Sequence, residues 1–292
     1  MTEDYKPKHE FLVGIDSDGC VFDTMEVKHK ECFIPNFINC YNLQWISKFA
    51  REAAEFVNLY SKSRGINRFP ALVEQLDWLR RRPEVQARGL KVPEPQGVIN
   101  WIEQETKLGN PTLERAVEAT GDPDLKKALD WSRHVNESIA AMVRGVPPFP
   151  RVKQCLERLV DVADMLVVSA TPNLALQGEW EEHNLAKFVI AICGQESGTK
   201  QETLAVAGQY AEGQSLMLGD APSDYKAAVA NKCLFYPINP GNEEASWKCL
   251  HEEGIDRFLA GTFQGEYQQQ LLREFNQCLP AEPPWTTKAM ET

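Results

Sequence analysis

Two aspartates near the start of the chain have the type and spacing for nucleophilic and acid–base chemistry. Asp16 and Asp18 come directly after the short apolar run Phe11–Ile15, and Gly19 follows them. A run of this length and composition predicts a buried parallel strand, whose carboxyl end is where open sheets bind ligands. Two carboxylates there are costly to bury unless they are paired, protonated or bound to a cation. One could attack while the other moves a proton, but the pair also fits a plain turn.

Two further stretches carry groups suited to phosphate oxygens. Ser169 and Ala170 follow the apolar residues 165–168, which places a hydroxyl and backbone N–H groups at the start of the next predicted helix. Lys200 comes after a glycine-containing loop, again at a predicted helix start. Taken singly, Ser169 also fits a helix cap and Lys200 a solvated surface charge. Their meaning depends on whether the fold brings them to the aspartate pair.

A second acidic stretch repeats the design of the first. Residues 216–218 are apolar, and Gly219, Asp220 and Asp224 follow them. With Asp16, these carboxylates would supply the hard oxygen ligands that Mg²⁺ prefers, completed by water and substrate oxygen. A turn followed by a capped helix would explain Asp224 alone. The stretch therefore indicates a metal site shared between two strand ends.

The composition limits the classes of partner. The chain has 292 residues, 43% of them hydrophobic, and a formal net charge of −11. A general nucleic-acid binder or a protein of anionic membranes would be basic, so neither partner is expected. A phosphate site in this acidic chain must create its own positive field with a metal, a lysine or helix N-termini.

The first ten residues are charged and contain no apolar signal segment, and no run approaches a membrane span, so we expect a cytoplasmic protein. The eight cysteines include no Cys-x-x-Cys pair and are interpreted as reduced thiols of the core. Neither a zinc site nor a disulfide framework is expected.

The pattern of elements predicts two domains. Strands and helices alternate from residue 151 to residue 236, which indicates an α/β domain with a Rossmann-like parallel sheet. Between residues 24 and 144 the pattern is helical, and a proline-rich linker ends it. We therefore predict an α/β core made of residues 1–23 and 145–280, an inserted helical cap of residues 24–144 and a polar tail of residues 281–292. The expected strands include residues 188–192.

The motifs resemble, in order and spacing, the four motifs of the haloacid dehalogenase (HAD) superfamily of hydrolases. The match is carried by Asp16-Ser-Asp18-Gly, by Ser169, by Lys200 and by Gly-Asp220-Ala-Pro-Ser-Asp224. Four motifs together are far more specific than any one of them. A helical cap inserted after the first motif is similar to the phosphoglucomutase and phosphonatase-like branch. Cys20 departs from the pattern, because phosphatases of the family most often have Thr there.

The resemblance implies phosphoryl transfer through a phospho-aspartyl intermediate. It implies Asp16 as nucleophile and Asp18 as general acid and base, with magnesium held by Asp16, the Asp18 carbonyl and Asp220. It further implies that Ser169, Ala170 and Lys200 bind the phosphoryl oxygens. Asp224, a further candidate of the metal site, would act from the second shell on Lys200 or a metal-bound water.

The choice within the family follows from Asp18, because the resemblance implies that dehalogenases and phosphonatases lack an acid at this position. We predict a phosphatase for a small phosphorylated metabolite, with a phosphomutase or a non-catalytic binding protein as alternatives. Residues 61–69 of the predicted cap form a basic loop between two helices, and Arg64 or Arg68 is a hypothetical contact for the leaving group. A solvated loop explains both arginines equally well.

Overall fold

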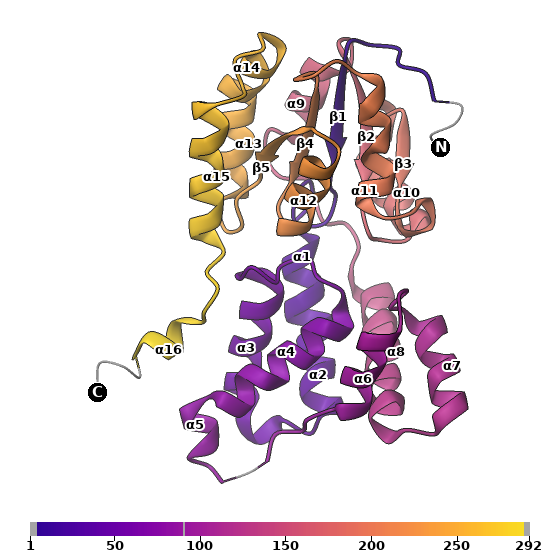
Figure 1. The fold of residues 1–292 in the computed structure, drawn as a ribbon, viewed down its shortest axis with the longest axis vertical. Helices are drawn as coiled ribbons and strands as arrows, with labels where there is room; N and C mark the ends of the chain where they lie inside the picture. Colours follow the sequence, from indigo (N-terminus) through magenta and orange to yellow (C-terminus); the bar gives the residue numbers. More distant parts are fainter. Residues whose placement is uncertain (1–4, 90, 289–292) are drawn as a thin grey trace. The chain divides into compact units, whose positions relative to one another are not determined.

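The computed structural model describes residues 5–89 and 91–288. The chain divides into two compact units (Figure 1). One, here called the core unit, takes in the chain up to Met25 together with Arg144–Leu279. The other, here called the helical unit, takes in Glu26–Val143 together with the chain from Pro280 onward.

The core unit is built on five parallel strands in the order β3-β2-β1-β4-β5. The strands are β1 (Phe11–Ile15), β2 (Ala163–Val168), β3 (Ala191–Cys193), β4 (Ser215–Gly219) and β5 (Leu234–Pro237). β1 lies at the centre, with β2 on one side and β4 on the other. The carboxyl ends of these three neighbouring strands therefore meet at one edge of the sheet, as the sequence predicts.

Helices cover both faces of this sheet, because alternate residues of each strand point to opposite sides. One face carries Val13, Met165 and Leu216 and packs against α9, α10, α13 and α14. The other face carries Leu12, Leu166 and Met217 and packs against residues 204–207, α12 and α15. The α/β fold class predicted from the alternating pattern is thus confirmed.

The helices of the core unit are short. They are α9 (Val152–Leu159), α10 (Asn173–Glu182), α11 (Lys200–Thr203), α12 (Pro222–Ala230), α13 (Glu243–Cys249), α14 (Ile255–Leu259) and α15 (Glu266–Cys278). The strand expected at residues 188–192 is largely wrong. Residues 186–188 form a 3₁₀ turn and β3 begins only at Ala191, because the local apolar run does not decide which of its residues reach the sheet edge.

The helical unit contains no strand among its described residues. Its helices are α2 (Ile34–Cys40), α3 (Ser47–Leu59), α4 (Arg68–Arg81), α5 (Pro83–Gln86), α6 (Gln96–Gln104), α7 (Asn110–Thr120), α8 (Pro123–Met142) and α16 (Pro284–Lys288), while α1 (Thr24–Val27) starts in the core unit. Asn67 caps α4 and Asp122 caps α8, each accepting a hydrogen bond from a backbone N–H. Phe37, Leu76 and Trp131 lie in a core of this unit's own.

The segment after α15 differs from the expected loose tail over its described residues. It forms α16, and the Trp285 ring lies 5.8 Å from the ring of Phe56 and 4.4 Å from the guanidinium of Arg82. A single large aromatic residue gives this polar segment something to bury, which its composition obscures. Residues 289–292 of the predicted tail lie outside the described residues. No helix in the described ranges combines the length and the apolarity needed to cross a membrane.

Candidate active site

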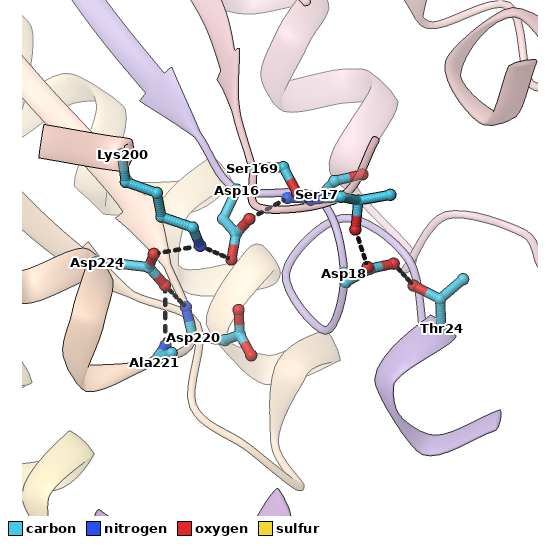
Figure 2. A network of polar contacts seen from close by, with 10 residues as sticks. Asp16, Ser17, Asp18, Thr24, Ser169, Lys200, Asp220, Ala221 and Asp224 are labelled. Carbon is cyan, nitrogen blue, oxygen red and sulfur yellow. Dashed lines mark hydrogen bonds and ion pairs between the residues drawn. The ribbon is translucent and has the colours of Figure 1, made fainter. Parts of the chain in front are cut away.

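Asp16 is the first residue beyond β1, and it is buried (Figure 2). Its backbone N–H donates to the Leu218 carbonyl of β4 at 3.0 Å, so the sheet ladder fixes the point where the side chain leaves. Its carboxylate Oδ1 accepts a hydrogen bond from the Ser17 N–H at 2.8 Å. The side chain is therefore mounted rigidly at the centre of the sheet edge.

Lys200 faces Asp16 from the start of α11. Its Nζ lies 2.7 Å from Asp16 Oδ2 and 2.6 Å from Asp224 Oδ1. Burial alone would lower the pKa of Lys200, but the two carboxylates outweigh it and raise that pKa. Thr199 starts the helix by accepting a hydrogen bond from the Glu202 N–H, so the lysine is placed by a capping box. The ammonium is a fixed positive charge, which the acidic chain needs for an anionic ligand.

Asp224 stabilises the loop after β4 and orients Lys200. Its Oδ2 accepts hydrogen bonds from the backbone N–H groups of Asp220 (3.2 Å) and Ala221 (3.0 Å), while its Oδ1 takes Lys200. A Cβ on Gly219 would lie 2.4 Å from the Asp224 Cβ, so only glycine lets the loop fold back this closely. These contacts agree with the indirect role expected for Asp224.

Three buried carboxylates gather around this lysine. Ligand oxygens of Asp16, Asp220 and Asp224 lie within 4.8 Å of one another. Burial raises the pKa of Asp16 well above its ordinary range, and the nearby Asp224 and Asp220 add to this against the pull of Lys200.

These groups fit a divalent cation. When ionised, three carboxylates and one ammonium leave two negative charges, which such a cation would balance, and carboxylate oxygens are the donors that Mg²⁺ prefers. Asp224 already accepts three contacts, two of them on Oδ2, whereas Asp16 accepts one on each oxygen. Asp224 is therefore the most committed carboxylate, and Asp16 and Asp220 are the better direct ligands. The Asp18 carboxylate is not part of this cluster, so a metal contact by Asp18 would have to use its backbone carbonyl.

The carboxylate of Asp18 is held by two hydroxyl groups. Thr171 Oγ1 donates to Asp18 Oδ2 at 2.7 Å, and Thr24 Oγ1 donates to Asp18 Oδ1. Sequence reasoning assigned no role beside Asp18 to Thr24 or to Thr171. The position of Thr171 two residues after Ser169 is the only signal that pointed toward it.

Ser169 follows β2 and lies level with Ser17, since β1 and β2 pair in the register Ile15 with Val167. It is buried, and its Oγ accepts a hydrogen bond from the Thr171 N–H at 3.2 Å. Ala170 is exposed, and its N–H has no acceptor among the described residues. The fold thus brings Ser169 and Lys200, two of the predicted phosphate ligands, to the same sheet edge as Asp16.

Arg64 and Arg68 each donate hydrogen bonds within the helical unit. Arg64 Nη1 donates to the Leu59 carbonyl at 2.8 Å. Arg68 Nη1 donates to Ser132 Oγ (2.9 Å) and Asn136 Oδ1 (2.8 Å). A contact of either arginine with a substrate stays a prediction.

All eight cysteines are free thiols, five of them buried and three half-buried. Burial raises the pKa of the Cys20 thiol well above its ordinary value, and the neighbouring carboxylates act in the same direction. The protonated thiol is a poor nucleophile. Cys20 therefore packs beside the carboxylates as an inert side chain, and its backbone carbonyl accepts a hydrogen bond from Trp247 Nε1 at 2.7 Å.

The structure is similar to solved structures of HAD-superfamily hydrolases and phosphatases at low sequence identity. One is a candidate phosphoglycolate phosphatase from Lactobacillus delbrueckii, with 15% identity and a TM-score of 0.46 over 84% of this chain and 92% of the other. A haloacid dehalogenase-like hydrolase from Xanthomonas campestris matches over 86% and 97%, with 12% identity and a TM-score of 0.40. A predicted phosphatase from Clostridium acetobutylicum matches over 84% and 99%, with 12% identity and a TM-score of 0.42. No protein-family model matches the sequence, and no curated protein does. Likenesses this distant transfer no activity, so the function must be argued from the site.

Proposed function

We propose that the chain is a magnesium-dependent phosphatase of the HAD type, which hydrolyses a small phosphate monoester through a phospho-aspartyl intermediate on Asp16. The observation that carries the proposal is the buried Asp16 carboxylate, 2.7 Å from the Lys200 ammonium and in one cluster with Asp220 and Asp224. Three buried acids that lie close together, two of them in contact with one lysine, at the ligand-binding edge of a parallel sheet are typical of a site that binds a cation and an anion.

In the first proposed step, Asp16 attacks phosphorus and the bond to the leaving oxygen breaks. Asp18 gives that oxygen its proton. In the second step a water molecule loses a proton to Asp18 and displaces phosphate from Asp16, so each residue returns to its starting state. The separate settings of the two acids support this division of roles, because Asp16 lies against a cation while Asp18 lies between hydroxyl groups.

The remaining groups would bind the transferred phosphoryl group. Lys200 and the Ser169 hydroxyl would hold its equatorial oxygens, together with the Ala170 N–H. Asp16 and Asp220 would hold Mg²⁺, which when bound neutralises negative charge on the nucleophile and the phosphoryl group. Asp224 keeps Lys200 in place.

The test is the release of inorganic phosphate from an aryl phosphate and from a panel of metabolite phosphates, with magnesium and with a chelator. Wild type should turn over only with magnesium, and Asp16→Asn should lose at least about a thousandfold in kcat, as enzymes do when a nucleophile is removed. Asp161→Asn is the matched control, because Asp161 is an exposed aspartate of the same unit.

Undiminished turnover in Asp16→Asn, or turnover unaffected by the chelator, would contradict the mechanism. If no ester is hydrolysed, phosphoryl transfer between sugar phosphates is the next measurement. Transfer there would identify a phosphomutase, and its absence would favour a binding protein.

A further inference from the structure

The loops that follow β2 and β3 are joined by three hydrogen bonds. The Gln195 N–H donates to the Thr171 carbonyl at 3.0 Å, and the Gly194 N–H donates to Asn173 Oδ1 at 2.5 Å. In return the Asn173 N–H donates to Glu196 Oε2 at 2.8 Å. Both partners of each bond lie within residues 171–173 and 194–196, so these two short segments hold each other in place.

Gly194 makes this close approach possible. A Cβ added there would lie 2.2 Å from the Thr171 carbonyl oxygen and 2.6 Å from Asn173 Oδ1. The first of these atoms belongs to the backbone and cannot rotate away. Gly194 has an extended backbone with φ −103°, so the requirement is for space and not for an unusual conformation. Any larger residue would push the two loops apart.

The loop pair bears directly on the second acid of the site. Thr171, whose carbonyl is bonded to Gln195, uses its hydroxyl to hold Asp18 Oδ2 at 2.7 Å. Asp18 lies in the loop beyond β1, and Thr171 holds one of its carboxylate oxygens while Thr24 holds the other, so loss of the Thr171 hydroxyl would leave Oδ2 less restrained against rotation of the carboxylate. Acid–base catalysis is sensitive to such a rotation, because a displacement of about 1 Å can cost a hundredfold in rate.

We propose that Thr171 is a positioning residue for Asp18, and that residues 194–196 hold it in that role. The loop after β3 leads the chain to Lys200. It also fixes the orientation of Asp18, which follows β1. The catalytic consequence rests on the proposed function, whereas the effect on the Asp18 side chain does not.

The kinetic test compares Thr171→Val, which removes the hydroxyl, with Thr171→Ser, which keeps it. For the hydrolysis of an aryl phosphate, we expect Thr171→Val to lower kcat about ten- to a hundredfold with little change in KM, as for a misplaced general acid. Thr171→Ser should stay within about threefold of wild type, because its hydroxyl preserves the hydrogen bond. Equal kcat in wild type and Thr171→Val, or an equal loss in both variants, would overturn the proposal.

The second pair of variants tests the loop contact. Gly194→Ala should lower kcat in the same way as Thr171→Val, again with KM preserved. Gly208→Ala is the matched control, because a Cβ at Gly208 meets nothing within 4 Å and its φ lies outside the left-handed region. A Gly194→Ala enzyme that is folded and fully active would remove the loop from the proposal.

A structural measurement separates this inference from the proposed function. Crystal structures of wild type and Thr171→Val should show the Asp18 carboxylate in one orientation in wild type and turned or split between orientations in the variant. This outcome is expected even if no phosphate ester is hydrolysed. An unchanged Asp18 side chain in Thr171→Val would overturn the positioning role whatever the activity.

Discussion

Buried charges are used differently in the two units. In the core unit, the half-buried Lys200 pairs with two buried carboxylates, Asp16 and Asp224, at the sheet edge. In the helical unit, the buried Arg82 pairs with Glu52 at 2.6 Å and lies 4.4 Å from the rings of both Phe49 and Trp285. Arg82 thus links helices of the helical unit through a salt bridge and two aromatic contacts.

The difference shows how a functional cluster of charges can be distinguished from a structural one. Arg82 is surrounded by aromatic faces and by carboxylates that reach solvent, so its charge is satisfied within the fold. Around Lys200 both paired carboxylates are buried, and the buried Asp220 belongs to the same cluster, so their excess negative charge is kept from solvent. Burial is the main reason that the pKa of Asp16 is raised. An uncompensated cluster at a ligand-binding edge indicates a site for something that the chain itself does not supply.

After Asp16→Asn, the largest loss of kcat should come from removing the Lys200 ammonium of the core unit. Lys200→Ala should lower kcat by about a hundred- to a thousandfold, the usual loss when one group that stabilises transition-state charge is deleted. Lys226→Ala, at an exposed lysine of the same unit, is the control and should match wild type in steady-state kinetics. If the two variants have the same kcat, the Lys200 cluster is a structural ion pair like those of Arg82.

The next largest expected effect is the increase in the free energy of unfolding when magnesium binds. At a magnesium concentration about a hundred times its Kd, binding to the folded state should add about 2.7 kcal/mol to the free energy of unfolding. Thermal unfolding should therefore shift upward by several degrees in wild type, and the shift should disappear in Asp220→Asn.

Without metal, Asp220→Asn should be at least as stable as wild type, because it removes one of three crowded carboxylates. Asp161→Asn should keep the full magnesium shift. A full shift in Asp220→Asn would place the ion elsewhere.

Much of the core unit could be predicted from the sequence, and less of the helical unit. Asp16, Ser169 and Asp220 follow apolar runs, and parallel strands bring their carboxyl ends to one edge whatever the details of packing. The bond between Thr171 and Asp18 joins residues 153 positions apart and depends on side-chain rotation. The docking of Trp285 on Arg82 is equally non-local. Local patterns predict where elements end, but not which side chains meet across them.

Arg68 gives a third test, in the helical unit. Arg68→Ala should lower the free energy of unfolding by about 1–3 kcal/mol, because it removes hydrogen bonds of a charged donor to Ser132 and Asn136. The measurement is denaturant unfolding alongside the KM for the best ester. A raised KM with unchanged stability would instead support the predicted contact with substrate, and the contrast between the two units would weaken.

The smallest expected effect is on the free energy of unfolding, and it concerns Asp164, another buried aspartate of the core unit, which lies near the amino end of β2. Asp164 accepts hydrogen bonds from Tyr210 Oη at 2.7 Å, from the Lys8 N–H at 2.8 Å and from the His9 N–H at 3.2 Å. Burial alone would raise the pKa of Asp164, but these donors outweigh it and lower that pKa below its ordinary 3.8. Asp16, at the opposite edge of the sheet, has a raised pKa, because burial and the nearby Asp224 and Asp220 outweigh the effect of Lys200.

A lowered pKa in the folded state means that ionised Asp164 stabilises the protein above its ordinary pKa, and that this contribution is lost as the pH falls through the lowered value. Asp164→Asn should therefore be less stable than wild type at pH 7, by about 1–2 kcal/mol for weakened hydrogen bonds to a charged acceptor. The difference in free energy of unfolding between wild type and Asp164→Asn should become smaller below pH 4, as measured by urea unfolding across the acid range. If the difference in free energy of unfolding does not depend on pH, Asp164 stabilises the fold by its shape and not by its charge. The contrast between the charges of Asp16 and Asp164 would then be lost.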